Sequence, residues 1–317
     1  MSAPKSPRKG SLQFWPRKRA AKILPRINWK PINSDNSGKT PKGFICYKAG
    51  MLSAIVKDNT EHSMTKGKKI AVPVTIIECP PMKVLSVRFY KNGKVASEVV
   101  SEGLDKDLKR IIKYPKNKSH GIDDAKDYDD IRIMAYSNVK KTGIKKTPDI
   151  AEIGLSGSLD EKKSFAKDKM NKEIHISDVF ESGQVADFRG LTKGKGLQGP
   201  LKRFGLTLRQ HKSEKGRRGP GSLGPWHPAR VTFRTPLAGQ MGMFTRAVYN
   251  SKIIKIFKAG EEGAAMKGLS HYGDVKSDAV IVRGSVQGPQ KRQLLMVHAL
   301  RPTRKQSKKN MEFIELR

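Results

Sequence analysis

The chain has 317 residues, enough for one large domain or two ordinary ones, and 36% of them are hydrophobic. Its 64 Lys and Arg residues outnumber 29 Asp and Glu, which gives a formal net charge of +35. A compact chain with this charge repels itself unless a polyanion neutralises it, so nucleic acid is the expected partner. An anionic membrane is disfavoured, because we find no apolar run of spanning length and no basic amphipathic helix.

Residues 1–42 are expected to form a basic N-terminal extension. They hold eleven Lys and Arg, one acidic residue and six prolines, with little apolar periodicity. Such a segment buries too little surface to fold alone, so we expect it to become ordered on a partner. Met1 leads into polar sequence without the apolar stretch of a signal peptide, which favours an intracellular protein.

Residues 43–95 are expected to form the first strands of a sheet or barrel. The runs GFICYKAGMLSAIV and IAVPVTIIE are rich in β-branched residues and are bounded by Gly and Pro. Asn92-Gly93 lies between two further apolar runs and predicts a hairpin. Cys46 and Cys79 lack the spacing of a metal site or a disulfide framework, so we expect them to be small core residues.

A nearly neutral block follows, with 16 acidic and 17 basic residues between positions 98 and 178. The spacing of its leucines and isoleucines predicts a helix over residues 104–112, with Ser101 as N-cap and Pro115 after its end. DIRIMAYS alternates like a strand, and SLDEKKSFAKDKM is typical of a helix. We therefore expect an α+β insertion at residues 96–175 that faces solvent and is not a main contact to a polyanion.

The remaining chain returns to strands around one anomalous segment. SGQVADFRGL predicts a return strand, at residues 176–189. Residues 190–247 are expected to form a basic, Gly-rich finger loop, since positions 189–247 hold 13 Lys and Arg against Glu214 alone. KIIKIF, DAVIVRGSV and KRQLLMVHAL predict strands within residues 248–317, and MEFIEL predicts a final edge strand.

GKGLQG, residues 194–199, formally matches the GxGxxG pattern of dinucleotide sites. Such a site needs a helix at the loop and an acidic residue about 20 positions on, but Pro200 follows the motif and only Glu214 lies in that window. The favoured interpretation is close approach of the backbone to nucleic-acid phosphates, neutralised by the neighbouring Lys and Arg residues. A mobile linker is the remaining alternative.

The sequence shows no catalytic set, because HExxH, CxxC, GxSxG and Walker patterns are all missing from it. We therefore expect no enzyme activity, no cofactor and no metal. His298 is expected in a half-buried strand. His211 and His227 lie in the basic loop, where an imidazole can hydrogen-bond or stack on a nucleotide, with simple solvent exposure as the alternative.

Trp226 stands in GPGSLGPWHPAR, between glycines and prolines that disfavour a strand or helix. It could fold back into a core, remain exposed at a cost in solvation, or pack against an RNA base or sugar. The flanking prolines stiffen the tip and the arginines can bind phosphates. These surroundings favour the third interpretation.

Seven stretches resemble one family when taken in chain order: GSLQFWPRKRA, YKAGM, VTIIECPPMKV, GLTKGKGLQGPLKRFG, LGPWHPARV, AGQMGMFTRAVYN and GSVQGPQKRQLLMV. The chain is identified by them as a member of the universal large-subunit ribosomal protein L-three family, of the archaeal/eukaryotic type. The match covers the N-terminal extension, the strands and the finger loop, and is weakest across residues 95–175. The chain's size favours the archaeal side, because eukaryotic members carry a further C-terminal extension.

The resemblance implies a mainly β fold, with a six-stranded β-barrel of the translation-protein type, an α+β insertion and long basic extensions that penetrate RNA. It implies a structural constituent of the cytoplasmic large ribosomal subunit, one copy per ribosome, that binds 23S-type rRNA, supports assembly and contacts neighbouring ribosomal proteins. The family's tryptophan loop reaches towards the peptidyl transferase centre and thus indirectly towards tRNA; Trp226 occupies that tip.

The residues expected to bind rRNA are the aromatic, basic and histidine residues of these motifs. They are Trp15, Arg17, Lys18, Arg19, Lys193, Lys195, Lys202, Arg203, Arg209, His211, Lys212, Arg217, Arg218, Trp226, His227, Arg230, Arg234, Arg246, Lys291 and Arg292. Two other functions remain as alternatives. An RNA-modifying enzyme should show a cofactor loop or a paired acid and base, and neither is visible. A DNA-architectural protein is the weaker of the two.

Overall fold

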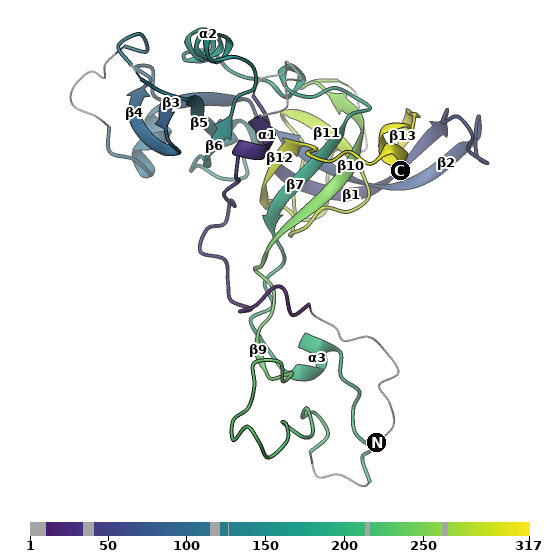
Figure 1. Ribbon diagram of the computed structural model, residues 1–317. Coiled ribbons are helices and arrows are strands. Elements are labelled where there is room, and N and C mark those ends of the chain that lie inside the picture. The colour runs from purple at the N-terminus through teal and green to yellow at the C-terminus, as the bar shows by residue number, and fades with distance from the viewer. Residues whose placement is uncertain (1–10, 34–40, 115–120, 126, 213–215, 262–265) are drawn as a thin grey trace. The chain divides into compact units, whose positions relative to one another are not determined.

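The computed structural model describes residues 11–33, 41–114, 121–125, 127–212, 216–261 and 266–317 (Figure 1). Most of its regular structure is β, as the sequence predicts. The strands are β1 (Gly43–Asp58), β2 (Lys69–Cys79), β3 (Met82–Lys91), β4 (Lys94–Val100), β5 (Asp130–Ser137), β6 (Ile150–Gly154), β7 (Val185–Leu191), β8 (Leu197–Gln198), β9 (Gly239–Gln240), β10 (Thr245–Phe257), β11 (Asp278–Arg283), β12 (Gln293–His298) and β13 (Met311–Leu316). The helical segments are α1 (Lys30–Asn33), η1 (Lys106–Arg110), η2 (Val139–Thr142), α2 (Leu159–Lys169), η3 (Ile176–Asp178), α3 (Pro200–Phe204) and α4 (Arg304–Ser307).

Seven strands form the larger sheet, in the order β12–β7–β10–β11–β2–β1–β13. β1 is long enough to serve two partners beside β2: residues 43–47 pair with β12, and residues 54–58 pair with β13. A shift in the register with β2 between Lys48 and Gly50 separates the two halves of β1. The pairing of β1 with β12 links the sixth strand of this order to its first. The predicted edge strand at MEFIEL is confirmed as β13.

The second sheet has the order β4–β3–β5–β6 and carries the helix α2 (Figure 1). The predicted hairpin is confirmed, since β3 and β4 pair antiparallel and Asn92 and Gly93 take φ of 50° and 76° between them. The predicted strand DIRIMAYS is β5. Ser158 begins α2 with a capping box, in which its side chain accepts from the Glu161 amide and the Glu161 side chain accepts from the Ser158 amide.

Two details of the predicted insertion differ from the structure. β3 pairs with β4 and β5, so the four-stranded sheet begins at Met82 and not after residue 95. The helix predicted over residues 104–112 is only the 3-10 turn η1, which buries Leu108, while Leu104 and Ile112 pack against the same small cluster from either side of the turn. Its N-cap is Asp105, while Ser101 instead donates to Asn171 Oδ1 at 3.0 Å. Pro115 lies outside the described residues.

The largest core cluster contains side chains from both sheets. Phe44, Phe188 and Leu295 of the larger sheet are buried in it together with Phe89 and Ile133 of the smaller sheet. A second cluster, with members on β1, β2, β10 and β11, belongs to the larger sheet. The two cysteines are free and buried, as predicted.

Trp29 brings part of the predicted N-terminal extension into this core. Its side chain is 1% exposed, and its Nε1 donates to the Glu152 carbonyl oxygen at 3.0 Å. Gly43 makes the space, because a Cβ at that position would lie 2.8 Å from the Trp29 ring. The segment around Trp29 is therefore anchored in the fold and does not behave as a free arm.

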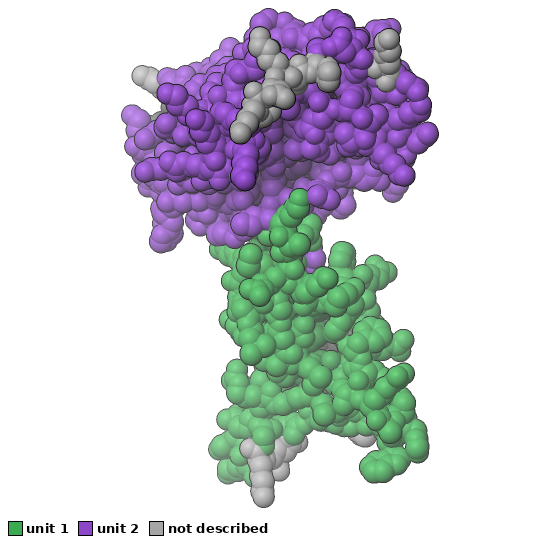
Figure 2. All heavy atoms as spheres, turned by 90° about the vertical axis from the view of Figure 1, so that its left-hand side faces the viewer, with its two compact units in different colours: residues 1–22, 191–245 green, residues 23–190, 246–317 purple. Residues whose placement is uncertain are grey.

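The chain divides into two compact units (Figure 2). Unit 1 comprises residues 1–22 and 191–245, which are the first half of the predicted extension and nearly all of the predicted finger. Unit 2 comprises residues 23–190 and 246–317 and contains both large sheets. Unit 1 contains β8, β9 and α3 as its regular elements among the described residues.

Candidate nucleic-acid interface

Two segments of unit 1, residues 192–198 and 239–244, run antiparallel where the finger begins, and we call them the limbs. The Thr192 amide donates to the Phe244 carbonyl at 3.0 Å, and the Lys195 amide donates to the Met241 carbonyl at 2.9 Å. β8 and β9 continue this ladder. Gly242 permits the close approach: its φ is +79°, and a Cβ there would overlap the Lys193 carbonyl oxygen. A glycine outside the GKGLQG motif therefore sets the tightest contact between the limbs.

Arg203, on α3, braces the two limbs from inside. Its Nε donates to the Gln240 carbonyl at 3.1 Å, and its NH1 donates to the Leu237 carbonyl at 2.9 Å. Burial lowers the pKa of this guanidinium. Lys202, the neighbouring residue, is exposed. The structure thus separates two residues that the sequence had treated alike, since Arg203 is used within the unit and Lys202 faces solvent.

An aromatic cluster of Trp15, Phe204 and Phe233 attaches residues 11–22 to the finger within unit 1, and we call it the Trp15 cluster. The Trp15 ring stacks on Phe204 with centroids 6.4 Å apart, and meets Phe233 edge-on at 5.6 Å. The Arg17 guanidinium lies 4.5 Å from the Phe204 ring centre. Sequence reasoning selected Trp15 and Arg17 but missed the two phenylalanines. The available signal was their position beside basic residues, in KRF and TFR.

The segment around Trp226 is exposed. The Trp226 side chain is 88% exposed, and it lines a groove of about 420 Å³ together with Leu223, Pro228 and Val231. The Thr235 hydroxyl donates to the Leu223 carbonyl at 3.1 Å and ties the two sides of the segment together. Trp226 is therefore no core residue of either unit, and the interpretation of a folded-back side chain is wrong.

Most of the Lys, Arg and His residues selected from the sequence face solvent in unit 1. The exposed ones are Lys18, Arg19, Lys193, Lys195, Lys202, His211, Lys212, Arg217, Arg218, His227, Arg230 and Arg234. Arg209 is half-buried, and its amide donates to the Arg217 carbonyl at 3.3 Å, which closes a turn around His211.

The other three selected residues belong to unit 2. Arg246 lies at the start of β10, where its carbonyl accepts from the Gln287 side chain at 3.1 Å. Lys291 and Arg292 precede β12, and their backbone bonds to Lys48 fix the turn. Burial lowers the pKa of Arg292, whereas Lys291 is exposed. These residues are not brought together with the finger in one unit.

Unit 1 combines this charge with exposed apolar side chains. Its 77 residues hold 18 Lys and Arg against one acidic residue. Of the 17 exposed large hydrophobic residues described in the chain, nine lie in unit 1: Leu12, Phe14, Leu197, Leu208, Leu223, Trp226, Val231, Phe233 and Leu237. None of the buried residues in the three core clusters lies in residues 11–22, 191–212 or 216–245. Unit 1 thus has cations and apolar surface available for a partner, and no core cluster of its own in the described residues.

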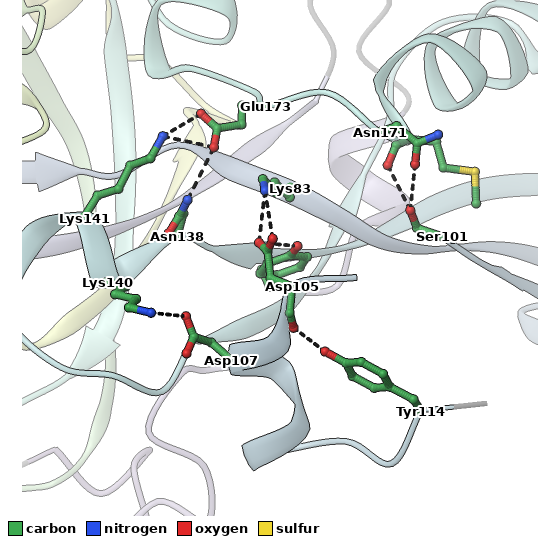
Figure 3. Close-up of polar contacts among 12 residues, drawn as sticks. Lys83, Ser101, Asp105, Asp107, Tyr114, Asn138, Lys140, Lys141, Asn171 and Glu173 are labelled. Carbon is green, nitrogen blue, oxygen red and sulfur yellow. Dashed lines mark hydrogen bonds and ion pairs between the residues drawn. The ribbon is translucent and has the colours of Figure 1, made fainter. Parts of the chain in front are cut away.

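The α+β insertion of unit 2 satisfies its charges internally. In Figure 3, Lys83 points at Asp105 with a separation of 3.0 Å, and Lys140 and Lys141 point at Asp107 and Glu173. Burial would raise the pKa of Glu173, but the Lys141 ion pair outweighs it and the pKa is lowered. Residues with such partners are less available to a polyanion than the exposed cations of unit 1.

Within the described ranges, no group of three or more His, Cys, Asp or Glu side chains is arranged to hold a metal ion. No described helix combines the length and the apolar character that crossing a membrane would need.

The chain resembles known proteins along its length. The sequence model of the family described as ribosomal protein L3 matches residues 1–317. The large ribosomal subunit protein uL3 of Archaeoglobus fulgidus is 42% identical over 309 residues, covering 93% of this chain and 92% of that protein. The uL3 proteins of Methanocaldococcus jannaschii and Pyrobaculum aerophilum are 38% and 39% identical, covering 93% and 94% of this chain and 92% and 93% of theirs. The chain belongs to the ribosomal protein L3 family.

Proposed function

We propose that the chain is a structural constituent of the cytoplasmic large ribosomal subunit, where it binds 23S-type rRNA and contacts neighbouring ribosomal proteins. Membership of the family supports this role. The observation that carries it is the composition of unit 1, with 18 cations, one acidic residue and nine exposed large hydrophobic side chains. Such a surface suits RNA, because cations neutralise phosphates and flat apolar groups pack on bases and sugars.

Unit 1 acts as an RNA-penetrating finger with the arm of residues 11–22 attached to it. The paired limbs and the Trp15 cluster give the finger a defined base, which lowers the ordering cost on binding. Trp226, 88% exposed at the tip, packs against rRNA near the peptidyl transferase centre and affects tRNA there only indirectly. Its role is packing, because the indole offers a flat face to a base or sugar.

Unit 2 supplies the scaffold. The ring of pairings that joins β12, β7, β10, β11, β2 and β1 supports the six-stranded translation-protein-type barrel expected from the family. One copy of the chain is present in each subunit. It supports assembly because its cations neutralise rRNA segments and thereby hold them together.

Co-sedimentation tests the function. The full chain should stay with large subunits through a high-salt wash, and a chain lacking the exposed cations of unit 1 should be lost at lower salt. An RNA-modifying enzyme or a DNA-binding protein would be washed off in both forms.

Replacement of Trp226 tests the finger separately. Ribosomes carrying Trp226→Ala should assemble but show altered tRNA accommodation or altered sensitivity to peptidyl transferase inhibitors, since one lost stacking contact costs about 1–3 kcal/mol. Normal behaviour in both assays would remove Trp226 from the proposed site.

A further inference from the structure

A pocket of about 520 Å³ opens in unit 2 where β7 begins and β12 ends. Its lining includes Gln184, Val185, His298, Leu300, Pro302 and Ser307. These residues mix apolar walls with a few polar groups, which is typical of sites that take a flat, partly polar ligand. We call it the 298 pocket.

The walls of the 298 pocket are fixed by contacts behind them. The Gly183 amide donates to the Ile253 carbonyl at 3.0 Å. The Asp187 carboxylate accepts from the Leu300 amide, and burial raises its pKa. The His298 ring stacks on Phe180 with centroids 4.3 Å apart. The backbone of the walls is therefore in place before any ligand arrives, and binding needs only a side-chain adjustment, which keeps the ordering cost low.

The far side of the pocket is fixed by a buried lysine. Lys252 is 5% exposed, burial lowers its pKa, and its Nζ donates to the Ser307 carbonyl at 3.2 Å. This bond holds the short helix α4 against β10. Because Ser307 lines the pocket, the bond also fixes the position of that wall.

One wall of the pocket contains an oriented amide, that of Gln184. Gln184 Nε2 donates to Glu181 Oε2 at 3.2 Å, so the opposite end of the amide is set in place. Gln184 Oε1 is buried and has no hydrogen-bond partner among the described residues. A buried acceptor without a donor is unfavourable, and an N–H of a bound ligand would satisfy it after a small adjustment of the wall.

The segment that supplies Leu300, Pro302 and Ser307 to the lining is strongly basic, and we call its cations the basic rim. Residues 299–310 contain five Lys and Arg and no acidic residue. Four of the five, Arg301, Arg304, Lys305 and Lys308, are exposed. A rim with this charge attracts phosphates and repels the basic segments that are common in rRNA-binding proteins.

We propose that the 298 pocket receives one unpaired nucleobase of the large-subunit rRNA. The base enters between Leu300 and Pro302 and offers an N–H to Gln184, while the phosphates on either side bind the basic rim. A base swung out of its stack is the form in which proteins read RNA by shape and edge contacts. The inference rests on the proposed binding of rRNA, and it adds a second contact that is independent of Trp226.

Chemical probing of the rRNA at nucleotide resolution tests the pocket in purified large subunits. Ala299→Phe fills the pocket, and a triple change of Arg304, Lys305 and Lys308 to Ala removes most of the rim charge. A matched control changes Lys106, Lys109 and Arg110 to Ala, which removes the same charge from the insertion. One unpaired nucleotide should become about tenfold more reactive in the first variant, and more reactive in the second, but not in the control.

Ultraviolet crosslinking of wild-type subunits gives the second measurement, and a nucleotide should be found on the peptide that contains His298. A crosslink from that peptide to a neighbouring protein would overturn the proposal. So would unchanged reactivity in both pocket variants when their chains co-sediment normally. If Ala299→Phe does not fold, the rim variant decides alone. Loss of the wild-type chain from salt-washed subunits would contradict the proposed function itself, and is thereby distinguished from failure of the pocket alone.

Discussion

Unit 1 and the α+β insertion of unit 2 are both rich in charged residues, but they use them in opposite ways. Residues 98–178, which make up most of the insertion, hold 16 acidic and 17 basic residues, and many of them pair, as Lys162 does with Asp130 at 2.7 Å. Unit 1 has 18 basic residues and one acidic residue, so its cations have almost no internal counter-charge. The ratio of acids to bases within a unit therefore indicates a surface for a polyanion better than the number of charges does.

The two units also differ in how they are held together. Unit 2 buries Phe44, Phe188, Ile281 and many similar side chains completely, and its strands pair along their length. Unit 1 depends on a short ladder, the Arg203 brace and the Trp15 cluster. Its stability should therefore depend on a partner far more than that of unit 2.

The largest expected difference between the two regions is in the salt dependence of rRNA binding after cations are removed from each. Changing five exposed cations of unit 1 to Ala should reduce the slope of log affinity for large-subunit rRNA against log salt by roughly 3.5 to 4.5, if each binds one phosphate. These are Lys18, Arg19, Lys193, Lys195 and Lys202. Filter binding over a salt series measures it.

The matched control for this change removes five exposed cations from the insertion: Lys106, Lys109, Arg110, Lys113 and Lys146. It should leave the slope almost unchanged. Equal losses in the two variants would mean that the acid-to-base ratio is a poor guide to the interface.

Truncating one aromatic residue in each unit should have different effects on the free energy of unfolding, because one residue is buried and the other is exposed. Phe188 is fully buried, so Phe188→Ala should lower the free energy of unfolding by about 3–5 kcal/mol. Trp226→Ala should change it by about 0.5 kcal/mol or less, because the side chain is 88% exposed. Thermal and urea unfolding of the free proteins measure both. A large loss for Trp226→Ala would mean that the tip packs on the protein.

The Trp15 cluster offers a sharper test inside unit 1. Trp15→Ala removes both of its ring contacts and should weaken the attachment of residues 11–20 by about 1–2 kcal/mol. Protease cleavage within that segment of the free protein should accelerate accordingly. Leu12→Ala, a change at a 40% exposed side chain, is the control and should have little effect. Equal cleavage of wild type and Trp15→Ala would show that the cluster does not hold the arm.

A small, pH-dependent effect is expected in unit 2 at the β1–β2 hairpin. Thr60, Thr65 and Ser63 donate to the Asp58 carboxylate and hold its pKa well below the usual range. The stabilisation is therefore complete above the unfolded pKa of about 3.9 and is lost as the pH falls towards the lower folded value.

Asp58→Asn should remove this dependence. Amide exchange of residues 59–68 at pH 6 and pH 3 measures it in both proteins. The wild-type tip should open more readily at pH 3, and the variant should show less change between the two pH values. A wild-type tip with the same opening equilibrium at both would contradict the assignment to Asp58.

The strands and the hairpin were predictable because they depend on local signals. Alternation in DIRIMAYS and the Asn92-Gly93 turn each need only a few neighbouring residues. Pairing between distant strands has no local signal, so the sequence could not reveal that β3 belongs with the insertion. Trp29 was missed for the same reason: its place in the core depends on a hydrogen bond to Glu152, which lies 123 positions further along the chain.

The candidate interface was predicted in its charge and not in its contacts. Lys193, Lys195 and Lys202 are exposed, as their basic, Gly-rich surroundings indicated. Arg203 has the same surroundings, yet it braces the limbs, because its role depends on carbonyl groups more than 30 residues away. Composition can identify a basic surface, but it cannot tell which cations the fold itself uses.

Amide hydrogen exchange, measured on the free protein and on large subunits that contain it, tests whether unit 1 becomes ordered only on its partner. In the free protein, residues 191–245 should exchange much faster than β1, β2 and β11, because unit 1 has little of its own structure to protect them. In the subunit, the same residues should become protected to a degree comparable with those strands. Strong protection of residues 191–245 in the free protein, or their continued rapid exchange in the subunit, would contradict an RNA-binding finger that depends on its partner.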